Sequence, residues 1–109
     1  MTSTESSVGR AKIFRLSGRL DFKAMRQSQK LQEKIRQAEQ RLVMLDFGGV
    51  PYIDSAGLGL LAIVHEELAP PKKKLILVNP QEGVKRILEL GNMGSFFSIC
   101  ETEQEALSQ

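Results

Sequence analysis

The sequence is poor in the residues from which catalytic and metal sites are usually built. Its 109 residues include one cysteine, one histidine and no tryptophan. The lone Cys100 cannot form an internal disulfide, which favours a reducing compartment and a small buried side chain at a strand end. His65 is the only histidine and the sequence shows no cluster of metal ligands around it, so we interpret it as a partly buried structural residue. No Gly-Lys phosphate-binding loop is present. We therefore expect no catalytic residues, no metal, no cofactor and no enzymatic activity.

Long hydrophobic runs and a large charge of one sign are also absent. The longest apolar run, 58–64, is interrupted by Gly59 and is far shorter than the about 20 residues that cross a bilayer. The polar N-terminus lacks the charged and apolar regions of a signal peptide. The formal net charge of +2 is too small to indicate a nucleic-acid-binding protein. We expect a soluble, cytoplasmic protein, monomeric by default, that neither enters a membrane nor binds nucleic acid.

The patterns that are present alternate between strand and helix. Residues 1–10 are rich in serine and threonine and show no periodicity, so we expect a flexible lead, followed by one domain over 11–109. Apolar runs predict strands at 13–17, 42–47, 75–78 and 96–100. Amphipathic or capped segments predict the helices. The first runs from an N-cap at Asp21 to about 40, the second covers 56–68, the third runs from Pro80 to a cap at Gly91, and the fourth follows Thr102, with Glu105 in the capping-box position. This order predicts an α/β domain, with a single mixed or mainly parallel β-sheet of about four to five strands packed with about four α-helices.

The most unusual segment is 52–61, where a strand leads through a turn directly into a helix. Asp54 or Ser55 can accept a hydrogen bond from an unpaired N–H group at the start of that helix, where a partial positive charge also favours anions. Phosphorylation of Ser55 would add roughly −1.5 to −2 charges there, next to the repelling carboxylate of Asp54. Gly57 and Gly59 each disfavour a helix by roughly 0.8–1 kcal/mol relative to alanine, and their lack of side chains would let a partner protein approach the backbone.

A simpler interpretation of the same segment stays open. An Asp-Ser pair before an apolar run is most often only an N-cap, and the glycines would then permit tight packing of the helix on the sheet. The apolar residues around Leu58 usually indicate burial in the core, with partner contact as the other interpretation. Similarly, we interpret the basic triplet at 72–74 as a solvated turn before a strand, with contact to nucleic acid or lipid as the alternative.

Several motifs of this chain resemble those of STAS-domain anti-sigma factor antagonists. Asp-Ser-Ala-Gly-Leu-Gly at 54–59 resembles the family signature Asp-Ser-(Ser/Thr/Ala)-Gly-(Leu/Val)-Gly. Gly-Arg-Leu-Asp at 18–21 resembles the Gly-x-(Leu/Ile)-Asp after the family's early strand, with Arg19 where many members carry glutamate. Further similarities lie at 47–53, 78–80, 84–88 and 90–93. The resemblance spans about residues 11 to 108 and implies the STAS fold.

The resemblance implies a binding switch. In this family the unphosphorylated antagonist binds an anti-sigma factor that is also an ATP-dependent serine kinase, and so releases a sigma factor or another target. The kinase phosphorylates the serine after the signature aspartate, here Ser55, which abolishes binding, and a PP2C-type phosphatase that needs divalent metal reverses the modification. Carried over to this chain, the resemblance implies a partner-binding surface made of Asp21, Asp54, Ser55, Ala56, Gly57 and Leu58, in which the two aspartates position the serine and contribute to kinase recognition.

Two other functions stay open at this point. STAS domains also serve as structural subunits of lipid-transport or stress-signalling complexes, and such subunits often lack the full signature that this chain carries. Alternatively, the start of the helix at 56–68 could bind a nucleotide phosphate, although its glycine pattern is not that of a recognised phosphate loop.

Overall fold

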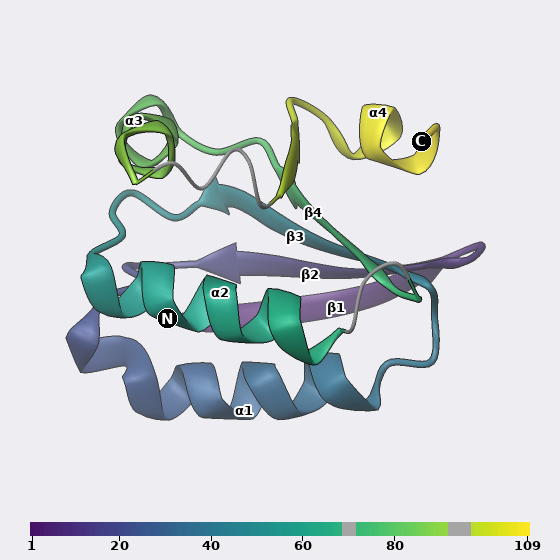
Figure 1. Cartoon of the computed structure of the whole chain (residues 1–109), viewed down its shortest axis with the longest axis horizontal. Helices are drawn as coiled ribbons and strands as arrows, with labels where there is room; N and C mark the ends of the chain where they lie inside the picture. The colour runs from purple at the N-terminus through teal and green to yellow at the C-terminus, as the bar shows by residue number, and fades with distance from the viewer. Residues whose placement is uncertain (69–71, 92–96) are drawn as a thin grey trace.

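The computed structural model describes residues 1–68, 72–91 and 97–109, and within these ranges the chain forms one mixed β-sheet with helices on both faces (Figure 1). The strand order follows the sequence; β1 runs antiparallel to β2, and all other neighbours are parallel. The elements are β1 (Thr2–Val8), β2 (Ala11–Ser17), the 3₁₀ turn η1 (Phe22–Ala24), α1 (Met25–Gln37), β3 (Leu42–Gly49), α2 (Ser55–Glu67), β4 (Lys74–Val78), α3 (Glu82–Leu90), β5 (Ser98–Cys100) and α4 (Glu103–Leu107). The predicted α/β domain with a mainly parallel sheet is confirmed.

The central strand β3 explains why the sheet needs helices on both faces. Successive side chains of a strand point to opposite faces. In β3, Val43, Leu45 and Phe47 join the core formed with α1, α2 and α3, whereas Leu42 and Met44 join a smaller core formed with α4. Because all five are buried, the strand has the nearly continuous apolar sequence that is typical of a parallel strand covered on both sides.

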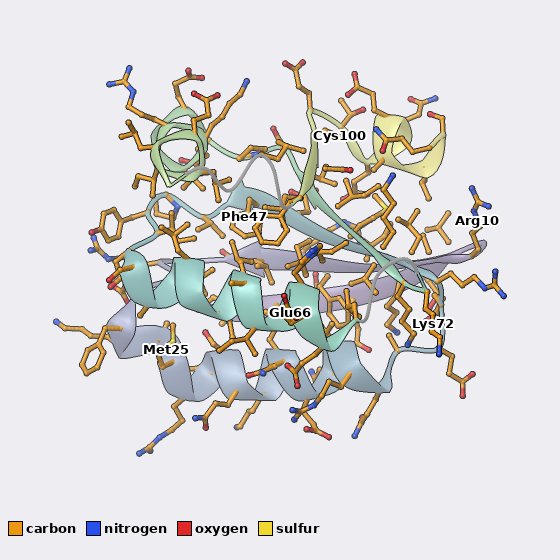
Figure 2. The ribbon with its side chains drawn as sticks, viewed as in Figure 1. Arg10, Met25, Phe47, Glu66, Lys72 and Cys100 are labelled. Atoms are coloured by element: carbon orange, nitrogen blue, oxygen red, sulfur yellow. The ribbon has the colours of Figure 1, made fainter. Side chains whose placement is uncertain are left out.

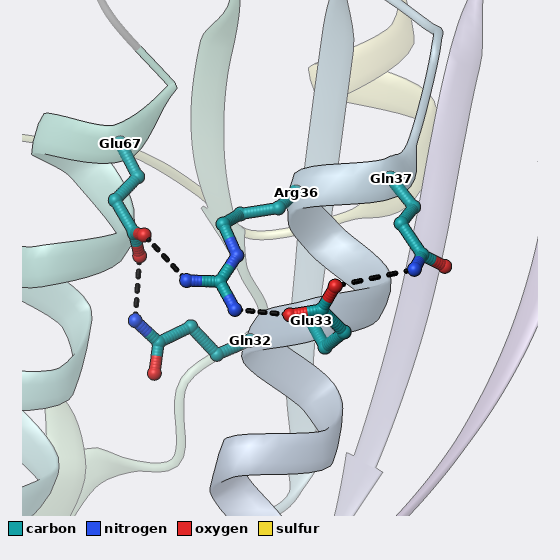
Figure 3. Close-up of polar contacts among 5 residues, drawn as sticks. All are labelled: Gln32, Glu33, Arg36, Gln37 and Glu67. Atoms are coloured by element: carbon teal, nitrogen blue, oxygen red, sulfur yellow. Dashed lines mark hydrogen bonds and ion pairs between the residues drawn. The ribbon is translucent and has the colours of Figure 1, made fainter.

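Helices α1 and α2 lie next to each other on one face of the sheet (Figure 1). Polar contacts join them near their C-terminal ends, as Figure 3 shows: the Glu67 carboxylate of α2 accepts hydrogen bonds from Gln32 and, at 2.9 Å, from the Arg36 guanidinium of α1. The same guanidinium contacts Glu33 on its own helix. These hydrogen bonds lower the pKa of the Glu67 carboxyl, the one from Gln32 most. The contacts fix the distal halves of the two helices and leave the start of α2 free of them.

The opposite face of the sheet is held to α4 by an ion pair. Nε and Nη2 of Arg15 in β2 donate to the two carboxylate oxygens of Glu103, at 2.9 and 2.8 Å, in the bidentate geometry that suits arginine. Arg15 lowers the pKa of Glu103. Partial burial, followed by the neighbouring Glu103, raises the pKa of Asp46 in β3. Ala106 of α4 is fully buried in the smaller core on this face.

The flexible lead expected over residues 1–10 is wrong, because residues 2–8 form strand β1. Its residues pair in register with β2, from Thr2 with Ser17 to Val8 with Ala11, and Glu5 forms an ion pair with Lys12 at 3.1 Å. Edge strands that carry polar side chains avoid pairing with other molecules. This strand therefore has no apolar alternation in its sequence, and its composition resembles that of a disordered segment.

Asp21 occupies an N-cap position as predicted, but that of the 3₁₀ turn η1 and without the expected side-chain cap. Its Oδ2 instead lies 3.0 Å from Nε of Arg19. Because the 3₁₀ turn comes first, α1 begins only at Met25. It ends at Gln37, before the predicted end near 40, because Ala38 has extended backbone with ψ of 129°.

The remaining helix ends agree closely with the sequence patterns. Helix α2 begins at Ser55, one residue before the predicted start, and Gly91 is the C-cap of α3. The Thr102 hydroxyl accepts a hydrogen bond from the backbone N–H of Glu105 at 3.0 Å, so its predicted capping role is confirmed. Three predictions fall outside the described residues: the helix stop at 70–71, the turn residues 92–93 and the first residue of the strand at 96–100.

Candidate functional site

The loops after β2 and β3 meet where these parallel strands end, and they build the surface around Ser55. Their backbones stay paired beyond the sheet: the N–H of Leu20 donates to the carbonyl of Tyr52 at 3.0 Å, and the N–H of Asp54 donates to the carbonyl of Leu20 at 3.4 Å. Leu20 and Ile53 form an isolated parallel bridge between the two loops, and both side chains are fully buried. The position of residue 54 is thus fixed from both sides.

Asp54 uses its two carboxylate oxygens to hold two different elements. Oδ1 accepts from the N–H of Gly57 at 3.0 Å and caps α2, which decides between the two capping residues, Asp54 and Ser55, that the sequence left open. Oδ2 accepts from the N–H of Phe22 at 2.9 Å and so takes over the capping of η1 that Asp21 does not provide. The bond from Phe22, followed by that from Gly57, lowers the pKa of the Asp54 carboxyl, so it is ionised at neutral pH.

Ser55 is the first residue of α2, and its side chain is exposed. Within the described ranges, its hydroxyl makes no hydrogen bond to another protein group. The cap is formed by Asp54, so the serine is not needed to stabilise the helix end. It presents a free hydroxyl at a helix N-terminus, where the partial positive charge of the helix tolerates a negative group.

The two glycines of the segment have different surroundings. Gly57 is buried, and a Cβ atom there would lie 2.4 Å from the carbonyl oxygen of Leu20 and 2.6 Å from Cγ1 of Ile53. Tight packing therefore explains Gly57, and its backbone is not open to a partner. Gly59 is exposed, and a Cβ atom there would meet nothing within 4 Å. The idea that a missing side chain leaves room for a partner applies only to Gly59.

Two exposed aromatic residues flank this site, Tyr52 within the segment 52–61 and Phe22, which the sequence patterns did not single out. Phe22 is 76% exposed, directly beside the carboxylate of Asp54. The guanidinium of Arg19 lies 4.4 Å from the ring centroid of Tyr52, in cation–π contact, while it also pairs with Asp21. The sequence did contain a signal for Phe22: this aromatic residue follows Gly-x-Leu-Asp and does not fit the apolar stripe of the next helix. A pocket of about 650 Å³ opens beside this surface and is lined by Met1, Arg19, Asp21, Lys23, Ala24 and Gln27.

Of the predicted site residues, the structure brings Asp54, Ser55, Ala56 and Leu58 together at the start of α2, with Asp21 in the adjacent loop. Ala56 and Leu58 are half-buried, and Leu58 also packs against the main core. The described residues contain no group of three His, Cys, Asp or Glu side chains that could hold a metal ion. His65 is not part of the site; its ring packs edge-on against Phe97 at 5.3 Å.

Comparison with known proteins identifies this arrangement. Residues 4–106 match the family model described as the STAS domain. The chain belongs to the STAS domain family. A STAS-domain containing protein of Pseudomonas aeruginosa is 26% identical over 99 residues, which cover 91% of this chain and 97% of the relative. The anti-sigma F factor antagonist of Lysinibacillus sphaericus is also 26% identical, over 98 residues that cover 89% of this chain and 83% of the relative.

Solved structures of STAS proteins share the same fold. The unphosphorylated anti-sigma factor antagonist SpoIIAA is 28% identical, with a TM-score of 0.77 over 97% of this chain and 93% of SpoIIAA. The phosphorylated form of SpoIIAA from Bacillus is 27% identical, with a TM-score of 0.70 over 98% of this chain and 97% of that structure. The mixed five-stranded sheet and the helices on its two faces are thus those of the STAS fold. Within the residues that the structure describes, no helix has the length and apolar character to span a membrane.

Proposed function

We propose that this chain is an anti-sigma factor antagonist that works by partner switching. In its unphosphorylated form it binds an anti-sigma factor that is also an ATP-dependent serine kinase, and so releases the target of that factor. Phosphorylation of Ser55 by this kinase abolishes binding, and a PP2C-type phosphatase restores it. The observation that carries the proposal is the exposed, unpaired Ser55 hydroxyl next to an Asp54 carboxylate that already caps the helix. Relatives named as anti-sigma factor antagonists, including SpoIIAA in both phosphorylation states, support it.

The physical effect of the phosphate would be mainly a change of surface charge. A phosphoserine carries roughly −1.5 to −2 charges at neutral pH. Here it would stand beside the ionised Asp54, so a partner surface that approaches Ser55 would meet a dense negative charge. Because Asp54, and not Ser55, holds the first turn of α2 and η1, the modification removes none of the hydrogen bonds on which the loop structure depends.

The remaining residues of the site would have distinct roles. Half-buried Ala56 and Leu58 would give the partner a small apolar contact close to the serine. Asp21, held by Arg19, and Asp54 would orient the partner kinase by charge. Gly57 would contribute from beneath, by letting α2 pack closely on Leu20 and Ile53.

The test is affinity capture from the native cell lysate with three baits: wild type, Ser55→Asp and Ser7→Asp. Ser7 is exposed on β1, at a distance from α2 along the sheet, and its substitution adds the same charge. We expect wild type and Ser7→Asp to retain a small ATP-binding serine kinase and Ser55→Asp to lose it. Equal retention of that kinase by all three baits would refute the role of Ser55. Copurification of a membrane transporter with all three would point to the structural-subunit function.

A further inference from the structure

A cluster of cations lies at the amino ends of the parallel strands, at the end of the molecule opposite the start of α2. Ala11, Leu42 and Lys74 are register partners across β2, β3 and β4. Arg10 and Arg41 immediately precede the first two strands, and the N–H of Lys74 donates to the carbonyl of Arg41 at 2.8 Å. Figure 2 shows Arg10 and Lys72 at this end, far from Met25 at the other. A basic residue thus stands directly before β2 and β3 and at the first position of β4.

These cations surround a pocket of about 220 Å³ that is lined by Arg10, Arg41, Leu42, Lys72, Lys74 and Gln109. The buried Leu42 side chain is the apolar member of the lining. Gln109 holds two of the cations in place: its main-chain oxygen accepts from Nη2 of Arg10 at 3.0 Å, and its Oε1 accepts from Nζ of Lys74 at 3.3 Å. The positive charge of the pocket is therefore partly ordered before any ligand binds, which lowers the entropy that binding must overcome.

No carboxylate side chain neutralises this charge. Every Asp and Glu of the chain lies within the described ranges, and within them none has an oxygen within 4.0 Å of a side-chain nitrogen of Arg10, Arg41, Lys72 or Lys74. Elsewhere in the molecule, Arg15, Arg19 and Arg36 each contact a carboxylate. Like charges on adjacent strands repel each other. Four cations that have no Asp or Glu side chain as a partner, gathered around a concave pocket, concentrate positive potential and attract anions.

We propose that this pocket binds a ligand that carries phosphate groups, such as pyrophosphate or the phosphate of an anionic lipid headgroup. Guanidinium groups bind phosphate oxygens in pairs, and lysines add point charges, so two arginines and two lysines suit a multiply charged phosphate. The pocket volume of about 220 Å³ accommodates one or two phosphate groups but not a length of nucleic acid or peptide. Residues 72–73 form the predicted turn before the strand that Lys74 begins, and to these residues the proposal adds a binding role that does not depend on the proposed switch at Ser55.

The experiment is calorimetric titration of the full chain with sodium pyrophosphate at constant, low ionic strength. The test variant combines Arg41→Gln with Lys72→Gln. The matched control combines Lys30→Gln with Arg86→Gln, which removes the same charge from exposed positions on α1 and α3. We expect saturable binding by wild type, a loss of affinity of about tenfold or more in the test variant, and little change in the control. Thermal unfolding of all three proteins verifies that each is folded.

A parallel sedimentation assay with vesicles distinguishes the two sources of phosphate. The vesicles contain either phosphatidylcholine alone or a mixture with phosphatidylglycerol. Pyrophosphate binding that is lost in the test variant supports a free phosphate ligand. Binding only to the phosphatidylglycerol vesicles, with the same loss in the test variant, supports a lipid phosphate. The proposal is overturned if wild type binds neither, or if the test and control variants lose binding equally, since the interaction then depends only on net charge.

Discussion

Replacing Gly57 by alanine tests the packing on which the position of Ser55 depends. The added Cβ would lie 2.4 Å from the Leu20 carbonyl oxygen and 2.6 Å from Cγ1 of Ile53. Neither neighbour can move freely, because the Leu20 carbonyl accepts a hydrogen bond from Asp54 and the Ile53 side chain is fully buried. Overpacking of this kind typically costs about 1–3 kcal/mol, against about 1 kcal/mol gained from the higher helix propensity of alanine. Because the contacts here involve backbone, we expect a net loss of about 1–2 kcal/mol or more.

The matched control is Gly59→Ala, two residues further along the same helix. A Cβ atom there meets nothing within 4 Å, so the substitution should stabilise the protein by about 0.4–1 kcal/mol. In thermal unfolding followed by circular dichroism, the two variants should therefore shift in opposite directions, and Gly57→Ala should unfold roughly 5–15 °C below wild type. A Gly57→Ala protein as stable as Gly59→Ala would refute the reasoning, because close packing would then not be what requires glycine at residue 57.

Three further changes address the residues around the site and the α4 face. Asp54→Ala should lower the unfolding midpoint at neutral pH, because the caps of α2 and η1 both lose their acceptor. Since the folded-state pKa of Asp54 is depressed, the difference in stability from wild type should be full above about pH 4 and should shrink as the pH falls further. Thermal melts at several pH values would measure it. Phe22→Ala should leave stability nearly unchanged but weaken binding of the kinase captured by wild type by about tenfold. The control is Leu90→Ala, at a residue 81% exposed on α3, which should leave binding intact. Equal affinities of the two variants would exclude Phe22 from the interface. Glu103→Gln should lower the pKa of Asp46, because a negative neighbour is removed, and an NMR titration of the Asp46 carboxyl that shows no downward shift would contradict that cause.

The elements that could be predicted from sequence are those whose signal is local. The apolar run of β3 reflects burial on both faces, and α2 was located within one residue because Asp54 caps it through a neighbour three residues away. Strand β1 could not be found in this way, because its stability comes from backbone pairing with β2 and its side chains are polar. A prediction from periodicity needs apolar residues that recur on one face, and Val8 is the only apolar residue of this edge strand.

The cap of η1 likewise could not be predicted from local sequence. The sequence offers Asp21 at the N-cap position, but the N–H of Phe22 bonds to Asp54, which is 32 residues away in the chain. Similarly, the requirement for glycine at residue 57 comes from Leu20 and Ile53, which approach only after the two loops have paired. The candidate site could thus be located from its motif, whereas the reasons for its rigidity depend on contacts that only the folded chain makes.

That rigidity bears on how the proposed switch would work. The start of α2 cannot move towards the β2–α1 loop, because Gly57 already touches Leu20 and Ile53. It cannot move away without breaking a hydrogen bond of Asp54 to Phe22 or Gly57. A phosphate on Ser55 would therefore act on the partner through charge and bulk at the surface, with little rearrangement of this chain. A partner that discriminates the two states must then contact Ser55 itself, and exposed Phe22, held by the same Asp54, would be fixed in position for that contact in both states.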